Sequence, residues 1–160
     1  MTAALVIAML VVATAMSGAL FKPGPWYRTL RKPNWTPPDM VFPIVWTVLY
    51  AMIGYAGWLV WRDTGTGVAM TFWILQLVLN AAWSWLFFGL RRMDLALVDV
   101  SLLILCVLGF IVAAHDAVPL ASLLFLPYLA WVAVAAALNL RVLQMNPVAM
   151  REAVRPAKLP

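Results

Sequence analysis

The sequence predicts an all-α integral membrane protein, a single bundle of five transmembrane helices. Of its 160 residues, 66% are hydrophobic and 11% are charged, whereas a soluble domain is usually about one quarter charged. The mean hydropathy is +0.95. Five apolar runs are each long enough to cross a hydrocarbon core of about 30 Å as a helix. A soluble globular domain and a disordered chain are therefore excluded, and one cysteine excludes a disulfide scaffold.

The expected helices follow one another along a single domain, residues 1–160. They span residues 2–21, 41–61, 68–90, 95–114 and 119–140, with a long loop at 22–40 and a basic tail at 141–160. The first run lacks the basic residues that precede the apolar stretch of a signal peptide, because its first basic side chain, Lys22, follows it. We interpret it as an uncleaved helix.

The distribution of basic residues predicts the orientation of the bundle. With five spans, Arg62 lies alone on one side of the membrane. The other side holds the remaining ten lysines and arginines: Lys22, Arg28, Arg31, Lys32, Arg91, Arg92, Arg141, Arg151, Arg155 and Lys158. The positive-inside rule then places the N-terminus outside and the C-terminus and long loop inside. This asymmetry accounts for the pI of 9.9, so nucleic acid is not expected as a partner.

Polar and aromatic residues form stripes on three of the expected helices. At 100° per residue, the third helix places its stripe within an arc of about 80°. The stripes are Trp73, Gln76, Asn80, Trp83 and Phe87 on the third helix, Pro43, Trp46, Tyr50, Gly57 and Trp61 on the second, and Tyr128, Trp131, Ala135 and Asn139 on the fifth. One interpretation is interhelical hydrogen bonding and aromatic packing. The other is a cavity for a large, flat, apolar ligand.

The loop at 22–40 has an unusual composition. It contains five prolines, the aromatic residues Trp26, Tyr27 and Trp35, and the cations Arg28, Arg31 and Lys32. Because prolines reduce the entropy lost on ordering, we expect a formed lid over the bundle. The alternative is an interfacial anchor. A lid of cations and indoles suits an anionic, π-rich ligand.

Three blocks of residues resemble the tryptophan-rich sensory protein / translocator protein (TspO, peripheral-type benzodiazepine receptor) family, bacterial members included. The first block is Trp26, Tyr27, the run LRKPNWTPP at 30–38, Pro43, Trp46, Leu49 and Tyr50. The second is Gln76, Leu77, Leu79, Asn80, Trp83, the run FFG at 87–89 and ALVD at 96–99, and the third is PYLAW at 127–131 with Leu138 and Asn139. Together they cover residues 18–140.

This resemblance implies a five-helix membrane protein, usually a homodimer, in a bacterial inner or outer membrane and surrounded by membrane lipid. It implies a receptor or sensor that binds porphyrins such as protoporphyrin IX under the first loop and regulates tetrapyrrole metabolism or a stress response. By resemblance the pocket residues are Trp26, Trp35, Trp46, Tyr50, Asn80, Trp83, Trp131, Ala135 and Asn139. The stripes and the lid add Tyr27, Arg28, Arg31, Lys32, Gln76 and Phe87 as ligand-binding candidates.

The sequence offers no nucleophile–base pair, paired acids or metal-ligand cluster, so the catalytic residues are not assigned, and no metal site or required cofactor is expected. Family resemblance allows light-dependent oxidative degradation of porphyrin, for which Trp46, Trp83 and Trp131 are the candidate photochemical residues. Transport of tetrapyrroles or other hydrophobic ligands is the alternative function. Asp99 is expected to pair with Arg91 or Arg92; its alternative role is that of a proton-coupling carboxylate in a carrier.

Overall fold

A computed structural model describes residues 2–149 of the chain, and they are helical apart from the loops and turns. The elements are α1 (Thr2–Leu20), α2 (Pro25–Thr29), α3 (Val41–Thr64), α4 (Val68–Ser84), the π-helix η1 (Trp85–Gly89), α5 (Met93–Ala114) and α6 (Pro119–Met145). With η1 continuing α4, five of these helices are long and apolar enough to span a membrane. The predicted five-helix membrane bundle is confirmed.

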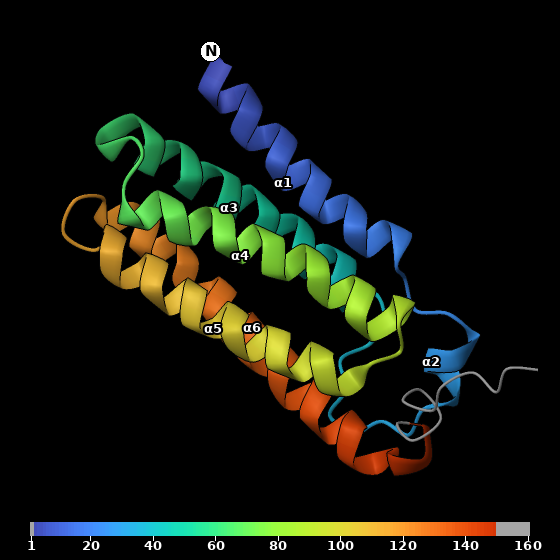
Figure 1. The fold of residues 1–160 in the computed structure, drawn as a ribbon. Coiled ribbons are helices and arrows are strands. Elements are labelled where there is room, and N and C mark those ends of the chain that lie inside the picture. Colours follow the sequence, from blue (N-terminus) through green and yellow to red (C-terminus); the bar gives the residue numbers. More distant parts are fainter. Residues whose placement is uncertain (1, 150–160) are drawn as a thin grey trace, which may run out of the picture.

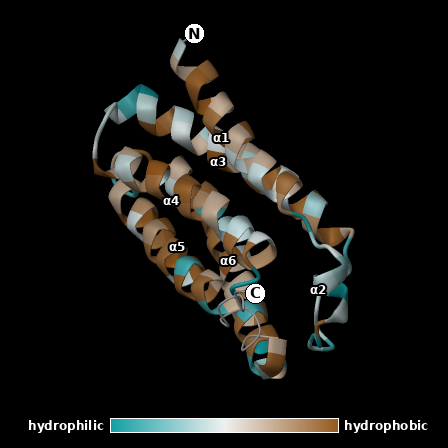
Figure 2. Cartoon of the chain, turned by 45° about the vertical axis from the view of Figure 1, so that its right-hand side comes forward, coloured by the Kyte–Doolittle hydropathy of each residue, from teal (hydrophilic) through white to brown (hydrophobic). Residues whose placement is uncertain are grey.

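The five long helices pack side by side in a closed arrangement (Figure 1). α5 lies between α4 and α6, α3 packs against α6, and α1 closes the bundle against α3 and α4. Figure 1 shows α2 at the end of the bundle where α4 and η1 turn into α5, opposite the end where α1 begins. Hydrophobic residues cover the long helices along their length, as Figure 2 shows, and hydrophilic residues gather mainly at their ends.

Three helices begin or end two or more residues away from the sequence-based expectation. α3 continues to Thr64 rather than ending at 61, α5 begins at Met93 rather than 95, and α6 continues to Met145 rather than ending at 140. Arg141 did not end the helix, because it is exposed and its guanidinium donates a hydrogen bond to Gln144 Oε1 (3.0 Å). A long cationic side chain can reach water from a helix that continues into the interface. Of the expected basic tail, Arg151, Arg155 and Lys158 lie outside the described residues.

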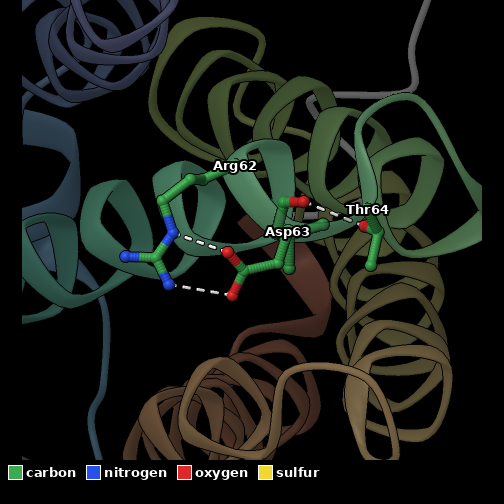
Figure 3. Close-up of polar contacts among 4 residues, drawn as sticks. Arg62, Asp63 and Thr64 are labelled. Carbon is green, nitrogen blue, oxygen red and sulfur yellow. Dashed lines mark hydrogen bonds and ion pairs between the residues drawn. The ribbon is translucent and has the colours of Figure 1, made fainter.

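The C-terminal end of α3 carries a cluster of polar contacts (Figure 3). Arg62 donates to both oxygens of Asp63 (2.5 and 2.9 Å), and Thr64 donates to the carbonyl of Val60 (2.9 Å). The Arg62 guanidinium also lies over the ring of Trp58, 4.9 Å from its centroid. This composition is typical of a helix end at the membrane–water interface.

Trp61 does not face the bundle, and the expectation that it would was wrong. Its side chain is 41% exposed, whereas its neighbours Leu59 and Val60 are buried. The inward stripe of α3 therefore ends at Gly57. Beyond that residue the inward face is occupied by smaller aliphatic side chains, and the indole lies outward.

The centre of the bundle depends on a close approach between α3 and α4 at Gly57. The fully buried indole of Trp73 lies against this glycine and donates from Nε1 to the carbonyl of Ile53 (2.9 Å). A Cβ atom at position 57 would come closer to the Trp73 indole than van der Waals contact allows. Gly57 is thus required by packing rather than by backbone conformation.

We predict that Gly57→Ala destabilises the protein by about 1–3 kcal/mol, because Trp73 must shift and give up its hydrogen bond. The matched control is Gly54→Ala, one turn away on the same helix. There the added Cβ would meet only Val11 Cγ2 at 3.7 Å, and better helix propensity makes the change neutral or slightly stabilising. Thermal unfolding in detergent measures both variants, and equal midpoints would contradict the packing argument.

Candidate functional site

A small cavity lies inside the bundle at the end covered by α2. It has a volume of about 30 Å³, enough for one or two water molecules. α6 contributes four lining residues at helical spacing, η1 and the end of α4 contribute aromatic rings, and α2 covers it with a tyrosine. The lining residues are Tyr27, Trp83, Phe87, Phe88, Ala135, Leu138, Asn139 and Val142. We call this space the lid cavity.

Aromatic side chains in contact with one another fill most of the space around the lid cavity. Trp83 stacks on Phe87, with ring centroids 5.0 Å apart and planes at 24°. Tyr27 meets Phe88 edge to face at 5.4 Å, and Trp26 meets Phe87 at 6.1 Å. Such pairs contribute about 0.5–1.5 kcal/mol each beyond their buried area. The walls of the cavity thus stabilise one another.

The π-helix η1 places two adjacent phenylalanines against the lid. Leu90 donates its backbone N–H to the carbonyl of Trp85 (2.8 Å), the i to i−5 pattern of a π-turn. Phe87 and Phe88 within this turn both contact the ring of Tyr27. A local widening of the helix therefore joins the third span to the lid.

Asn139 fixes the position of Trp83. Its side-chain oxygen accepts a hydrogen bond from the indole N–H of Trp83 (3.2 Å), and its side-chain nitrogen donates to the carbonyl of Met93 (2.9 Å). The amide is buried, so these two bonds satisfy polar groups that lipid cannot. One residue on α6 thereby orients a wall of the lid cavity and joins α6 to α4 and α5.

A second set of polar side chains lies deeper in the bundle and forms a continuous hydrogen-bond network. Tyr50 donates to Asn80 Oδ1 (2.8 Å), Asn80 Nδ2 donates to Tyr128 Oη (2.9 Å), and Tyr128 donates to Gln76 Oε1 (3.0 Å). Gln76 in turn donates to the carbonyl of Trp73 (3.0 Å). The order of hydrogen bonding is thus Tyr50, Asn80, Tyr128 and Gln76. Tyr50, Gln76 and Asn80 are site candidates from the sequence. None of the three lines the lid cavity.

Two further site candidates also lie away from the lid cavity. Trp131 lines an open groove of about 450 Å³ between α3 and α6 and meets Phe42 edge to face at 5.7 Å. Trp46 stacks on Tyr50 at 5.3 Å. The groove is lined by apolar side chains along the outer surface of the bundle: Ile44, Val45, Val48, Leu49, Met52, Pro127, Ala130, Trp131 and Val134. The three candidate photochemical tryptophans therefore lie in three different surroundings.

Among residues 2–149, the cations of the lid form no ion pair with a carboxylate. Within residues 2–149 the two side-chain ion pairs are Arg62–Asp63 and Arg92–Asp94. Lys32 Nζ lies over the ring of Tyr27 at 4.3 Å, and the side chains of Arg28 and Arg31 are exposed. Trp35, half exposed, does not line the cavity.

Tyr27 is held in its neutral form. Burial raises the pKa of its hydroxyl above the ordinary value, and the carboxylate of Asp39 raises this pKa further. The Tyr27 hydroxyl therefore contributes no charge to the lid near neutral pH.

Asp99 does not form the ion pair expected from the sequence. Arg92 donates to both oxygens of Asp94 (2.8 and 2.6 Å), and Arg91 lies over the ring of Trp26 at 5.9 Å. Asp99 is buried, and its Oδ2 has no hydrogen-bond partner among the described residues. The expectation was wrong because the nearer acid, Asp94, takes the arginine.

Comparison with known proteins assigns this arrangement to a family. A sequence model described as the TspO/MBR family matches residues 3–145. The chain belongs to the TspO/MBR family. It is 43% identical to the tryptophan-rich protein TspO of Chlorobaculum tepidum over 146 residues, covering 86% of this chain and 92% of that protein.

Other relatives extend from bacteria to animals. The chain is 40% identical to the tryptophan-rich sensory protein of Cereibacter sphaeroides, covering 84% of this chain and 85% of that one. It is 41% identical to the human translocator protein, with 76% and 75% covered. Membership of the TspO/MBR family, with five apolar helices, identifies a multi-pass integral membrane protein and supports a sensor or receptor role.

Sequence reasoning missed three residues that line the lid cavity in this TspO/MBR protein: Phe88, Leu138 and Val142. Val142 could have been found by extending the α6 stripe, because it follows Ala135 by seven residues, two helical turns. It was missed because the helix was expected to end at residue 140. Leu138 and Phe88 are ordinary hydrophobic residues whose types carry no signal.

We predict that Tyr128→Phe destabilises the protein by about 1–2 kcal/mol, because Asn80 Nδ2 and Gln76 Oε1 each lose their hydrogen-bond partner inside the membrane. The control is Tyr55→Phe, at a side chain that is 49% exposed. Thermal unfolding in detergent, followed by tryptophan fluorescence, compares the two variants. A midpoint for Tyr128→Phe equal to that of the control would argue against the network.

Proposed function

We propose that this protein is a membrane receptor for porphyrins, with protoporphyrin IX as the reference ligand, and that binding regulates tetrapyrrole metabolism or a stress response. The observation that carries the proposal is the aromatic lid cavity with exposed cations beside it. Flat π-systems stack on aromatic rings, and carboxylates pair with arginine or lysine. A porphyrin bearing propionate groups has both chemical features.

Binding requires the lid cavity to expand. Pockets for ligands of this size usually enclose about 300–1,000 Å³, against the 30 Å³ of the closed cavity. The ligand would separate Tyr27 from Phe87 and take the place of Phe87 against Trp83. Because the porphyrin ring would then stack on the indole in place of Phe87, the free-energy cost of opening is limited.

The lid cations are suited to orient the ligand. Arg28 and Arg31, in the same loop as Tyr27, are exposed. Exposed ion pairs contribute about 0–1 kcal/mol each. We therefore assign most of the affinity to stacking and burial of the porphyrin ring. The lid arginines would determine which end of the porphyrin points outward. Metal-free porphyrin fits this proposal because it needs no axial ligand.

We predict that Ala135→Leu weakens binding of protoporphyrin IX by about tenfold or more, because the larger side chain occupies a wall of the lid cavity. The matched control is Ala137→Leu, an exposed position on the same helix. Titration of the protein in lipid nanodiscs, followed by quenching of tryptophan fluorescence, measures both. Absence of saturable quenching in the unaltered protein would refute porphyrin binding, and equal affinities of the two variants would refute this location.

Light-dependent oxidative degradation is a second proposal, favoured by the position of one indole. Trp83 is the candidate photochemical residue that lines the lid cavity, while Trp46 and Trp131 do not. Light and oxygen would supply the driving force, with the porphyrin itself absorbing the light.

We predict that Trp83→Phe slows the loss of porphyrin absorbance under illumination in air, whereas Trp131→Phe leaves the rate unchanged. Both are compared at saturating protein, so that differences in affinity do not contribute. Loss that continues unchanged in argon, or equal rates for bound and free porphyrin, would show that the protein takes no active part.

A further inference from the structure

The lid has few polar connections to the helices it covers. Its hydrogen bonds are mostly internal, such as those from Thr29 to the carbonyl of Trp26 and from Thr36 to that of Pro33. Apart from the turn that leads into α3, the hydrogen bonds in residues 2–149 that join the lid to a helix both involve Asn146. The attachment of the lid thus depends strongly on one side chain just beyond α6.

The Asn146 amide binds both main-chain groups of one lid residue. The backbone N–H of Arg31 donates to Asn146 Oδ1 (2.9 Å), and Asn146 Nδ2 donates to the carbonyl of Arg31 (2.9 Å). The same nitrogen donates to the carbonyl of Val142 (2.7 Å), which fixes the amide against α6. An amide is suited to this arrangement because it carries an acceptor and two donors on one planar group.

The position of Asn146 connects this attachment to the lid cavity. On α6, Ala135, Leu138, Asn139 and Val142 line the cavity, and position 146 is one turn beyond Val142 on the same face. Leu30, adjacent to the bonded residue, is buried in a cluster with Phe87, Leu138 and Val142. Holding residue 31 therefore keeps Leu30 and Tyr27 packed over the cavity.

We propose that Asn146 is a positioning residue that controls how often the lid opens, and thereby the rate at which ligand enters and leaves the lid cavity. The second half of this inference rests on the proposed porphyrin binding. The two bonds to Arg31 are exposed to solvent, so each stabilises the closed lid by a modest amount. They use the backbone of residue 31 and leave its guanidinium available to a ligand.

The attachment through Asn146 is tested first without a ligand, by hydrogen exchange of the Arg31 amide in lipid nanodiscs. Asn146→Ala and Asn146→Leu remove both bonds, and leucine keeps the volume of the side chain. We expect exchange of a peptide containing this amide to accelerate about tenfold or more in both variants. The control is Gln144→Ala, which removes an exposed amide that bonds Arg141 rather than the lid. Unchanged exchange in both Asn146 variants, or equal acceleration in the control, would overturn this role of Asn146.

Stopped-flow kinetics with protoporphyrin IX test the effect on the site. Opening the lid more often raises the association and dissociation rates together and changes Kd less than either rate, whereas damage to the pocket raises Kd. Faster hydrogen exchange with unchanged ligand kinetics would overturn control of ligand access. If the unaltered protein does not bind protoporphyrin IX, the proposed function fails, and hydrogen exchange alone decides whether Asn146 holds the lid.

Discussion

The arrangement of this bundle depends on one constraint: polar side chains inside a membrane must find partners in the protein. Water is absent from the hydrocarbon core, so an unsatisfied amide or hydroxyl costs several kcal/mol there. The network of Tyr50, Gln76, Asn80 and Tyr128 meets this requirement across α3, α4 and α6. Because each member has defined partners, the network fixes the relative rotation of these three helices. The close contact of Trp73 with Gly57 then sets the separation of α3 and α4.

This constraint divides the interior into two regions with different freedom to rearrange. In the network region each side chain is held by directional bonds, and moving one leaves another unsatisfied. Around the lid cavity the contacts are mainly between aromatic rings such as Phe87, Phe88 and Tyr27, which can exchange one flat partner for another at little cost. Asn139 marks the boundary, since it holds Trp83 in place with a directional bond. A rigid middle thus supports an adaptable end.

Much of the fold could be predicted from the sequence. The length of each apolar run and the positions of the charged residues that follow it can be read directly from the chain, and they locate the membrane-spanning helices. The stripe of Gln76 and Asn80 also predicted inward amides correctly. The division of the candidate residues among the lid cavity, the network and the outer groove could not be predicted, since a stripe gives direction on a helix but not the partner it meets. Asp99 illustrates the same limit, because its expected arginine pairs with a closer acid. The predicted orientation of the termini and the homodimer stay predictions.

The mutual packing of the aromatic rings in the lid cavity has a consequence for selectivity. A membrane protein is surrounded by acyl chains at a concentration far above that of any dilute ligand, and an open apolar hole would be filled by them. Here the place is already taken by the protein's own rings. An incoming molecule must offer more contact than Phe87 makes with Trp83, which a thin flexible chain does not. For the proposed porphyrin site, the protein's own rings would thus act as a threshold against abundant lipids, which a broad, rigid ring system would be better able to overcome.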